Sequence, residues 1–151
     1  MPPLTRVRRR GLAAAGISPE AELGRPIADP ALSARLAGLA KLIAGCTAQP
    51  AVVVAAVVHA ELRTLAPFRT GTGVVARAAG RLTMVSRGLD PKALVVTEVG
   101  HLELVADYDA ALAAYARGEP DGVARWLRHS CQATELGARE ALAICEAVLR
   151  G

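Results

Sequence analysis

One glycine-rich stretch of this 151-residue chain has the residue types of a phosphate-binding loop. Residues 65–77 read LAPFRTGTGVVAR. Glycine readily adopts the positive φ angles that aim consecutive backbone N–H groups at an anion, and the start of a helix also favours negative charge. Arginine side chains on both sides of the glycines can pair with phosphate oxygens. The stretch therefore predicts an anion site made of Arg69, Gly71, Thr72, Gly73 and Arg77.

The same stretch has no side chain for acid–base catalysis or for strong metal binding. Residues 65–77 contain no histidine, cysteine, aspartate or glutamate. A general base must be a titratable group, and magnesium prefers carboxylate oxygens. We therefore expect binding without catalysis at this loop, with no catalytic residue and no metal.

Histidines and cysteines elsewhere in the chain show no spacing typical of a site. The histidines fall on different predicted elements without a metal-ligand pattern, so we expect no metal site. We interpret His59, seven residues before Ala66, as a packing residue. The three cysteines cannot all pair, and the last two lie 14 residues, or about 21 Å, apart on one predicted helix. We therefore expect no disulfide framework. These residues are His59, His101 and His129, and Cys46, Cys131 and Cys145.

The elements that must position the loop are predicted to be helices. Apolar residues make up 52 % of the chain and aromatic residues only 3 %, which favours close packing of Ala, Val and Leu on helices. Asp29 and Pro30 form a typical helix start, and leucines then recur at spacings of three and four until Gly45. This pattern predicts an amphipathic helix over residues 30–45.

Two further helices are predicted to frame the loop. The run AVVVAAVVHAELRTL over residues 51–65 suits a buried strand by its β-branched residues and a helix by its length of about 15. We choose the helix because Val54, Val58 and Leu62 form one stripe. A second helix is predicted over residues 74–86, with Gly88 as its C-terminal cap.

The remaining part of the chain is also predicted to be helical. Asp90 and Pro91 repeat the helix-start signature, so we expect a short helix, a kink near Gly100 and a second helix that ends at Gly118. Residues 121–149 follow a helical period despite Gly137 inside them. The sequence thus predicts an all-α bundle around a central helix–loop–helix.

The first residues of the chain are expected to form a separate arm. Residues 1–28 are rich in Pro, Gly and Arg and show no sustained period, which predicts a basic flexible arm before a helical domain at 29–151. Its arginines could bind an acidic partner or nucleic acid. The longest apolar run, residues 51–58, is too short for a membrane span, so we expect no membrane partner and a cytoplasmic protein. The arginines of the arm are Arg6, Arg8, Arg9 and Arg10.

Residues 59–77, HAELRTLAPFRTGTGVVAR, resemble the defining stretch of the Fic (Fido) family. Members of this family mostly transfer AMP from ATP to protein hydroxyls. Their pattern is His, x, Phe, x, Asp or Glu, Gly, Asn, Gly, Arg, x, x, Arg, and it aligns with residues 66–77 here. The later run DYDAALAAYARGEPDGVARWL also resembles the family, so the resemblance covers residues 31–130 and implies a Fic-like helical bundle.

The resemblance implies a binding loop whose reactive groups have been replaced. Ala66 stands at the position of the family's catalytic histidine, and Thr70 at that of the acidic residue that holds magnesium. Thr72 and Val74 replace an asparagine and an arginine that handle phosphate, whereas Arg77 matches the second arginine. Ser18 to Glu22 matches only part of a restraining motif found in many family members. We therefore expect a pseudoenzyme that binds or regulates, with ATP or another phosphate-bearing ligand held at the loop and magnesium held weakly.

Two alternatives remain open. GTGVVA, residues 71–76, also spells the G-x-G-x-x-A fingerprint of dinucleotide-binding folds, which would indicate a small NAD-binding or oxidoreductase-like protein. That fingerprint requires a strand directly before its first glycine. The other alternative is a pure interaction module that self-associates as a homo-oligomer or binds a protein partner that the sequence does not name.

Overall fold

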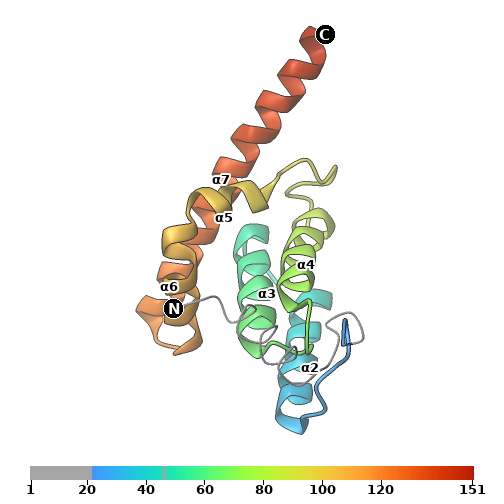
Figure 1. Cartoon of the computed structure of the whole chain (residues 1–151), viewed down its shortest axis with the longest axis vertical. Helices are drawn as coiled ribbons and strands as arrows, with labels where there is room; N and C mark the ends of the chain where they lie inside the picture. Colours follow the sequence, from blue (N-terminus) through green and yellow to red (C-terminus); the bar gives the residue numbers. More distant parts are fainter. Residues whose placement is uncertain (1–21, 46) are drawn as a thin grey trace.

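The structure, a computed structural model, describes residues 22–45 and 47–151 of the chain. Its helices are α2 (Pro30–Ala44), α3 (Ala51–Leu65), α4 (Thr72–Ser86), α5 (Thr97–Glu103), α6 (Val105–Ala116) and α7 (Pro120–Arg150) (Figure 1). The described residues form no sheet and contain only two isolated bridges. The prediction of an all-α fold is therefore confirmed. No helix within this part of the chain is both long and apolar enough to cross a bilayer.

Helix α2 begins and ends where the local sequence predicts. The Asp29 carboxylate accepts hydrogen bonds from the backbone N–H groups of Ala31, at 2.8 Å, and Leu32, at 3.4 Å. At the other end, the N–H of Gly45 donates to the carbonyl of Lys41. Both ends are thus fixed by bonds within a few residues of the chain.

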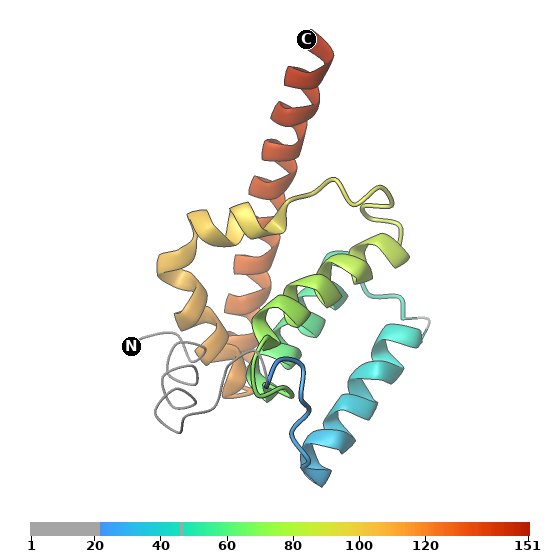
Figure 2. The ribbon, with the colours of Figure 1, turned by 45° about the vertical axis from the view of Figure 1, so that its right-hand side comes forward.

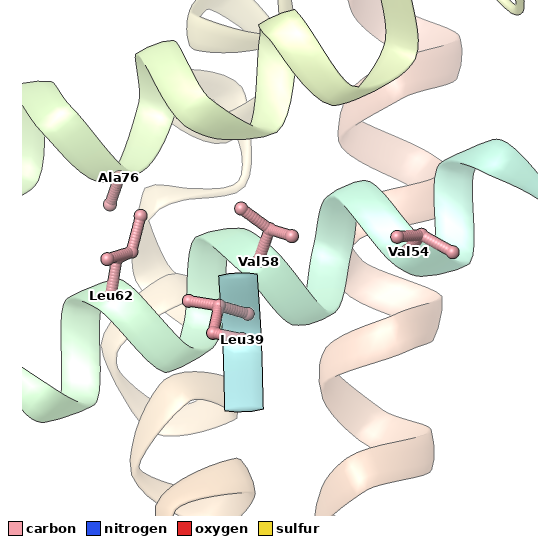
Figure 3. Packing of buried hydrophobic residues seen from close by; sticks show 5 residues of the cluster. All are labelled: Leu39, Val54, Val58, Leu62 and Ala76. Carbon is pink, nitrogen blue, oxygen red and sulfur yellow. The ribbon is translucent and has the colours of Figure 1, made fainter. Parts of the chain in front are cut away.

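Helices α3 and α4 pack side by side and carry the loop between them (Figures 1 and 2). The choice of helix over strand for residues 51–65 is confirmed. The α3 stripe contributes most of a hydrophobic cluster that also receives one residue from α2 and one from α4 (Figure 3). Its buried members are Leu39, Val54, Val58, Leu62 and Ala76.

A second cluster joins α3 to α6 and α7. Trp126 of α7 is completely buried among alanines of α3 and α6, and its indole Nε1–H donates to the carbonyl of Ala56 at 2.8 Å. Small residues let the helix backbones approach closely enough for this bond. A chain with few aromatics therefore relies on one tryptophan to fill the space between three helices.

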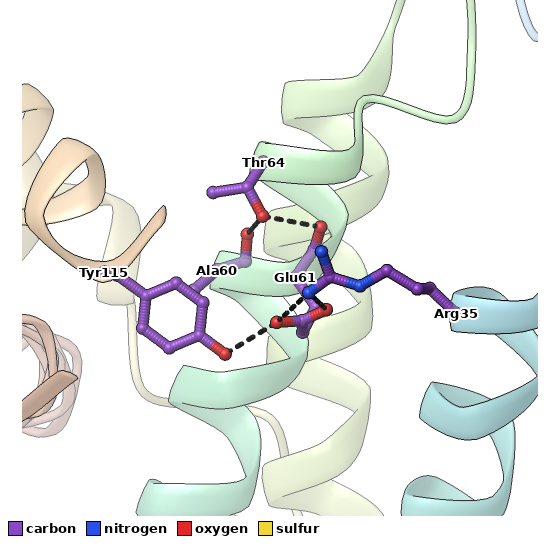
Figure 4. A network of polar contacts seen from close by, with 5 residues as sticks. All are labelled: Arg35, Ala60, Glu61, Thr64 and Tyr115. Carbon is purple, nitrogen blue, oxygen red and sulfur yellow. Dashed lines mark hydrogen bonds and ion pairs between the residues drawn. The ribbon is translucent and has the colours of Figure 1, made fainter. Parts of the chain in front are cut away.

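A polar network ties α2, α3 and α6 together on the outer side of the core (Figure 4). The Glu61 carboxylate accepts two hydrogen bonds from Arg35 Nη2, at 2.8 and 3.1 Å, and one from the Tyr115 hydroxyl at 2.9 Å. Burial, with the Glu61 carboxylate beside it, raises the pKa of Tyr115. Glu61 is thus fully used in holding three helices.

The prediction that a helix starts at Asp90 and Pro91 is wrong. Residues 91–96 are not helical, and α5 begins only at Thr97. The Asp90 carboxylate instead accepts from the N–H groups of Leu94 and Val95, each at 2.9 Å. It closes a wide loop rather than capping a first helical turn, because its partners lie four and five residues onward.

The kink predicted near Gly100 is present but falls four residues later. Gly100 lies inside α5, and the break between α5 and α6 falls at Leu104. A Cβ atom at Gly100 would lie 1.9 Å from the carbonyl oxygen of Ala133 in α7. The glycine therefore permits a close approach of two helices and does not bend the chain.

Helix α7 is the longest element, with 31 residues, and starts and ends close to its predicted limits. Its first half packs against α3, α5 and α6. Its second half extends away from all other described helices (Figures 1 and 2). Gly137 lies within this helix and packs against the Val96 carbonyl. A Cβ atom at this position would lie only 2.5 Å from the carbonyl oxygen, which explains why a glycine interrupts the helical pattern.

Candidate anion-binding site

The loop of residues 66–71 makes a tight connection between α3 and α4. Ala66 ends α3 with a left-handed φ of 47°, and Gly71 has a φ of 82° immediately before α4. Helix α4 starts at Thr72, two residues before the predicted start. The N–H groups of Val74 and Val75 donate to the Gly71 carbonyl. The N–H groups of Thr72 and Gly73 have no acceptor among the described residues.

Two arginine side chains converge on the first turn of α4. A Cβ atom at Gly73 would lie 3.5 Å from Nη1 of Arg77 and 3.7 Å from Nη1 of Arg63. Arg77 comes from α4 itself and Arg63 from the last turn of α3. Both guanidinium groups therefore lie near the positive end of the α4 dipole, in the place where Gly73 has no side chain.

This guanidinium pair, Arg63 and Arg77, has no acidic partner within the described part of the chain. Arg63 is only 8 % exposed, and its one hydrogen bond goes from Nε to the Tyr108 hydroxyl at 3.3 Å. Arg77 makes no ion pair or hydrogen bond with any residue of 22–45 or 47–151. A buried cation without a counter-charge is costly. Arg63 is buried and Arg77 half-buried, so the two guanidinium groups side by side favour an anion between them.

Arg69, the other arginine predicted for the site, has a different partner. Arg69 Nε lies 3.2 Å from the carboxylate of Glu22, which is itself buried and also binds Arg25 at 2.8 Å. Arg69 is thus held away from the guanidinium pair by an acidic residue from before α2. Thr72, another predicted site residue, is buried, and its hydroxyl donates to the Phe68 carbonyl.

Residues 22–28 lie along the loop and hold it in place. The N–H of Ile27 donates to the Pro67 carbonyl at 2.9 Å, and the N–H of Arg69 donates to the Arg25 carbonyl at 3.0 Å. A Cβ atom at Gly71 would lie 3.1 Å from the Leu23 side chain. The expected arm at 1–28 is described only for this part; the arginines at 6–10 and Ser18 lie outside the described residues.

The three histidines, predicted to lie on different elements, form one cluster with Tyr108 and Trp126. His59 of α3 and His101 of α5 meet edge to face with ring centroids 5.0 Å apart, and His101 stacks on His129 of α7 at 5.3 Å. Trp126 stacks on His129 at 5.4 Å. The histidines do lie on three different helices, α3, α5 and α7, and the packing of these helices brings their rings together. The expectation of a packing role for His59, which is 5 % exposed, agrees with this position.

Burial and hydrogen bonding keep His59 neutral. The Arg63 Nε–H donates to the Tyr108 oxygen at 3.3 Å, and the Tyr108 hydroxyl shares a hydrogen bond with His59 Nε2 at 3.0 Å. Burial lowers the pKa of His59 well below its usual value, and neighbouring His101, Arg63 and Arg77 lower it further. Burial also raises the pKa of Tyr108.

His101 and His129 are likewise held neutral. His101 Nδ1 and His129 Nε2 lie 3.1 Å apart, and His129 Nδ1 lies 3.7 Å from the Asp107 carboxylate. Burial, followed by His129 and Arg77, lowers the pKa of His101 to about 4. Burial lowers the pKa of His129 too, against the opposing effect of Asp107. His101 and His129 thus contact each other directly, with no space for an ion between their facing nitrogens. Among the described residues, no group of three or more His, Cys, Asp or Glu side chains could hold a metal ion.

A small cavity of about 30 Å³ lies beside this cluster, between α3, α4, α5 and α7. Arg77 and His59 line it, together with His101 and Arg81. The hydroxyl of Ser130, a residue only 6 % exposed, also lines the cavity and has no hydrogen-bond partner among the described residues. The space fits one or two water molecules or one small anion. Arg77 therefore connects the start of α4 with a polar interior.

The arrangement suits an oxyanion, and no carboxylate or histidine within residues 22–45 and 47–151 is placed to take a proton at the loop. Ala66, which ends α3 beside the loop, has no titratable side chain. The nearest carboxylates by sequence are engaged elsewhere: Glu61 in the polar network, and Glu98 at 3.7 Å from Arg81. The strand that a dinucleotide loop needs before its first glycine is not present, because α3 and the turn after it occupy that place.

Arg63 and the histidine cluster are the parts of the site that sequence reasoning missed. A signal for Arg63 exists: it lies four residues after His59, on the buried face of an apolar helix that leads directly into the loop. An arginine on such a face requires a partner or a ligand. The histidines carry no comparable signal, because their spacing along the chain does not reveal which helices touch.

Comparisons of the chain with protein-family models, with curated proteins and with solved structures found no match.

Proposed function

We propose that this protein binds a phosphate-bearing ligand, such as ATP, between the guanidinium pair and the start of α4, and that it does not transfer AMP. In this proposal it is a pseudoenzyme of the Fic type, with a binding or regulatory role. The α3–loop–α4 arrangement supports the Fic-type interpretation, since the loop with the family-like pattern joins two neighbouring helices of an all-α bundle.

One observation carries the binding proposal: Arg63 and Arg77 meet at Gly73 without a carboxylate among the described residues. Phosphate is the natural complement of such a pair, because guanidinium groups donate two parallel hydrogen bonds to its oxygens. The open N–H groups of Thr72 and Gly73 add donors at a helix start. The positive charge, the open N–H donors and the space at Gly73 thus all favour a phosphate-bearing ligand.

The residues around the loop support the absence of transfer chemistry. AMP transfer requires a group that takes the proton from the attacking hydroxyl. The histidine nearest to the loop in the sequence is His59. Its Nε2 is hydrogen-bonded to Tyr108, and the residue is only 5 % exposed. A magnesium ion would find a threonine hydroxyl at position 70 where the family pattern has a carboxylate.

Thermal unfolding with added ligands tests the binding proposal. We expect phosphate, pyrophosphate and ATP, at constant ionic strength, to raise the melting temperature, and adenosine to leave it unchanged. At ten times its dissociation constant a ligand stabilises by about 1.4 kcal/mol, which corresponds to about 4 °C for a chain of this size.

Matched variants make this experiment specific. Arg77→Gln should abolish the shift, whereas Arg128→Gln, which removes the same charge from an exposed position of α7, should leave it intact. An equal shift in the wild type and in Arg77→Gln would refute the proposed site. No shift with any phosphate compound would refute the ligand class.

Incubation with labelled ATP and magnesium or manganese, alone and with cell lysate, tests the absence of transfer. We expect no protein-bound label above that of a heat-inactivated sample. Transfer of label that disappears in Arg77→Gln would contradict the pseudoenzyme proposal while leaving the binding site in place.

A further inference from the structure

The second half of α7 presents an apolar stripe that no other described element covers. From Leu142 to the end of the chain every residue is exposed. Leu142 is 60 % exposed and Leu149, seven residues later on the same face, is 87 % exposed, and the helix projects beyond the body of the molecule (Figures 1 and 2). Large exposed apolar residues grouped on one face are typical of an interaction surface.

The stripe has the spacing of a coiled-coil seam. Its central residues recur at intervals of four, three and four, which is the a/d spacing of a heptad. We define the α7 stripe by these four exposed residues: Ala138, Leu142, Cys145 and Leu149. A strip of this kind on an exposed helix requires a second helix to bury it.

The charges beside the stripe point to the identity of that second helix. Four long charged residues follow its edge in the order acid, base, acid, base: Glu135, Arg139, Glu146 and Arg150. Reading this order backwards exchanges acids and bases. When an identical helix lies antiparallel, each acid therefore meets a base of the other copy, whereas in a parallel pair the edge with Arg139 and Glu146 would face the edge with the uncharged Ala141 and Val148.

We propose that the α7 stripe pairs antiparallel with the same stripe of a second copy of this chain. In the register that satisfies the charges, Arg139 meets Glu146 of the second copy. The same register places Leu142 against Cys145 of the second copy and Ala138 against Leu149. The apolar layers and the charged edge thus select one alignment, and the surface is complementary to itself as a two-fold interface must be.

This inference does not depend on the proposed ligand. The stripe lies in the half of α7 that extends away from the loop between α3 and α4 (Figure 1). In the single chain, Glu135 already binds Arg139 and Glu146 lies 3.7 Å from Arg150. These exposed pairs contribute little on their own and can be shared across the interface. The overlap of about 16 residues spans only about 24 Å, so we expect reversible association.

Cysteine cross-linking tests the register. In Leu142→Cys, the new thiol would face the native Cys145 of the second copy, and oxidised glutathione should convert the sample to a covalent dimer. Removing Cys145 as well, in Leu142→Cys with Cys145→Ser, should strongly reduce this product. Ala143→Cys, on the opposite face of the same helix, should give no more covalent dimer than the wild type.

Sedimentation over about 5 to about 500 µM protein tests the association itself. We expect the dimer fraction of the wild type to rise with concentration. Arg139→Glu should shift this rise to several-fold higher concentration, and adding Glu146→Arg should restore it, because opposite charges again meet across the interface. Arg128→Glu makes the same charge change outside the overlap and should behave like the wild type.

Several results would overturn the proposal. A mass that stays monomeric over the whole range would exclude the second copy as the occupant of the stripe. A dimer unaffected by Arg139→Glu, or one that Glu146→Arg does not restore, would place the interface elsewhere. If Leu142→Asp lowers the melting temperature without changing the mass, the stripe is covered by a segment of its own chain.

Discussion

At the scale of single residues, small changes of side chain decide what the loop can do. Gly73 leaves the space in which two guanidinium groups meet, and Ala66 at the end of α3 has no titratable group. The buried Arg63 contributes as much charge as the more apparent Arg77. The loop therefore has a charge suited to binding without the groups suited to reaction.

Backbone strain at single residues gives the first stability prediction. Ala93 has a positive φ of 53° outside any helix and is exposed. Glycine adopts this conformation without the Cβ clash, so Ala93→Gly should stabilise the protein by about 0.5 kcal/mol. Ala78→Gly, at an exposed position within α4, should destabilise it by about 1 kcal/mol. Urea unfolding measures both, and the same sign for the two variants would contradict the argument.

At the scale of elements, the bundle depends on helices that approach closely at glycines. Gly100, Gly122 and Gly137 each lie where a Cβ atom would meet a backbone carbonyl of another segment, at 1.9, 2.2 and 2.5 Å. All three contacts involve α7 or the segments packed against its first half. At these three positions glycine therefore allows two segments to pack closely, and it does not form a turn.

Substituting one of these glycines tests this packing. Gly100→Ala should cost about 3 kcal/mol, because α5 and α7 must move apart or bend to admit the methyl group. Gly38→Ala makes the same chemical change on the exposed face of α2, where nothing lies within 4 Å of the new atom. It should stabilise the protein by about 0.5 to 1 kcal/mol. Comparable urea midpoints for the two variants would show that the α5–α7 contact is not tight.

At the scale of the whole molecule, the histidine cluster joins α3, α5 and α7 and makes the fold sensitive to acid. All three histidines of the chain belong to this cluster, and each has a lowered pKa because of burial. The unfolded chain would protonate them near their usual pKa of about 6.5. The folded protein binds these protons only at lower pH. Its free energy of unfolding should therefore decrease at pH values at which the unfolded chain is already protonated.

The sign and the pH window follow from these pKa values. Above about pH 6.5 the histidines are neutral in both states and their contribution to stability is complete. As the pH falls, the unfolded chain gains protons that the folded protein does not, and for His101 this continues to its folded pKa of about 4. Stability should fall by up to about 1.4 kcal/mol per pH unit for each histidine.

Urea unfolding from about pH 7 to about pH 5 measures this loss. His101→Gln cannot titrate, so the variant should show a shallower decrease of unfolding free energy than the wild type, whatever its stability at neutral pH. Equal slopes for the two proteins would show that His101 is as easily protonated in the folded protein as in the unfolded chain.

The fold was largely predictable from the sequence, but the region of residues 90–104 was not. Helices α2, α3 and α7 follow clear apolar periods, and their ends carry local signals such as Asp29 before Pro30. Asp90 before Pro91 carries the same signal, yet its carboxylate closes a loop. The chain after it is placed by contacts with α7, including Val96 N–H to the Gly137 carbonyl. A local pattern cannot foresee such distant contacts.

The sequence by itself determined most of the helices, the turn at the glycines and the absence of titratable side chains from residues 65–77 other than arginine, because caps, turns and residue types act within a few residues. Only the tertiary structure decided which charges meet. It brought Arg63 to Arg77, tied Arg69 to Glu22, and placed His101 beside His129 although 28 residues separate them. These contacts depend on how whole helices pack, and side chains on different helices meet only after the core has fixed the distances between them.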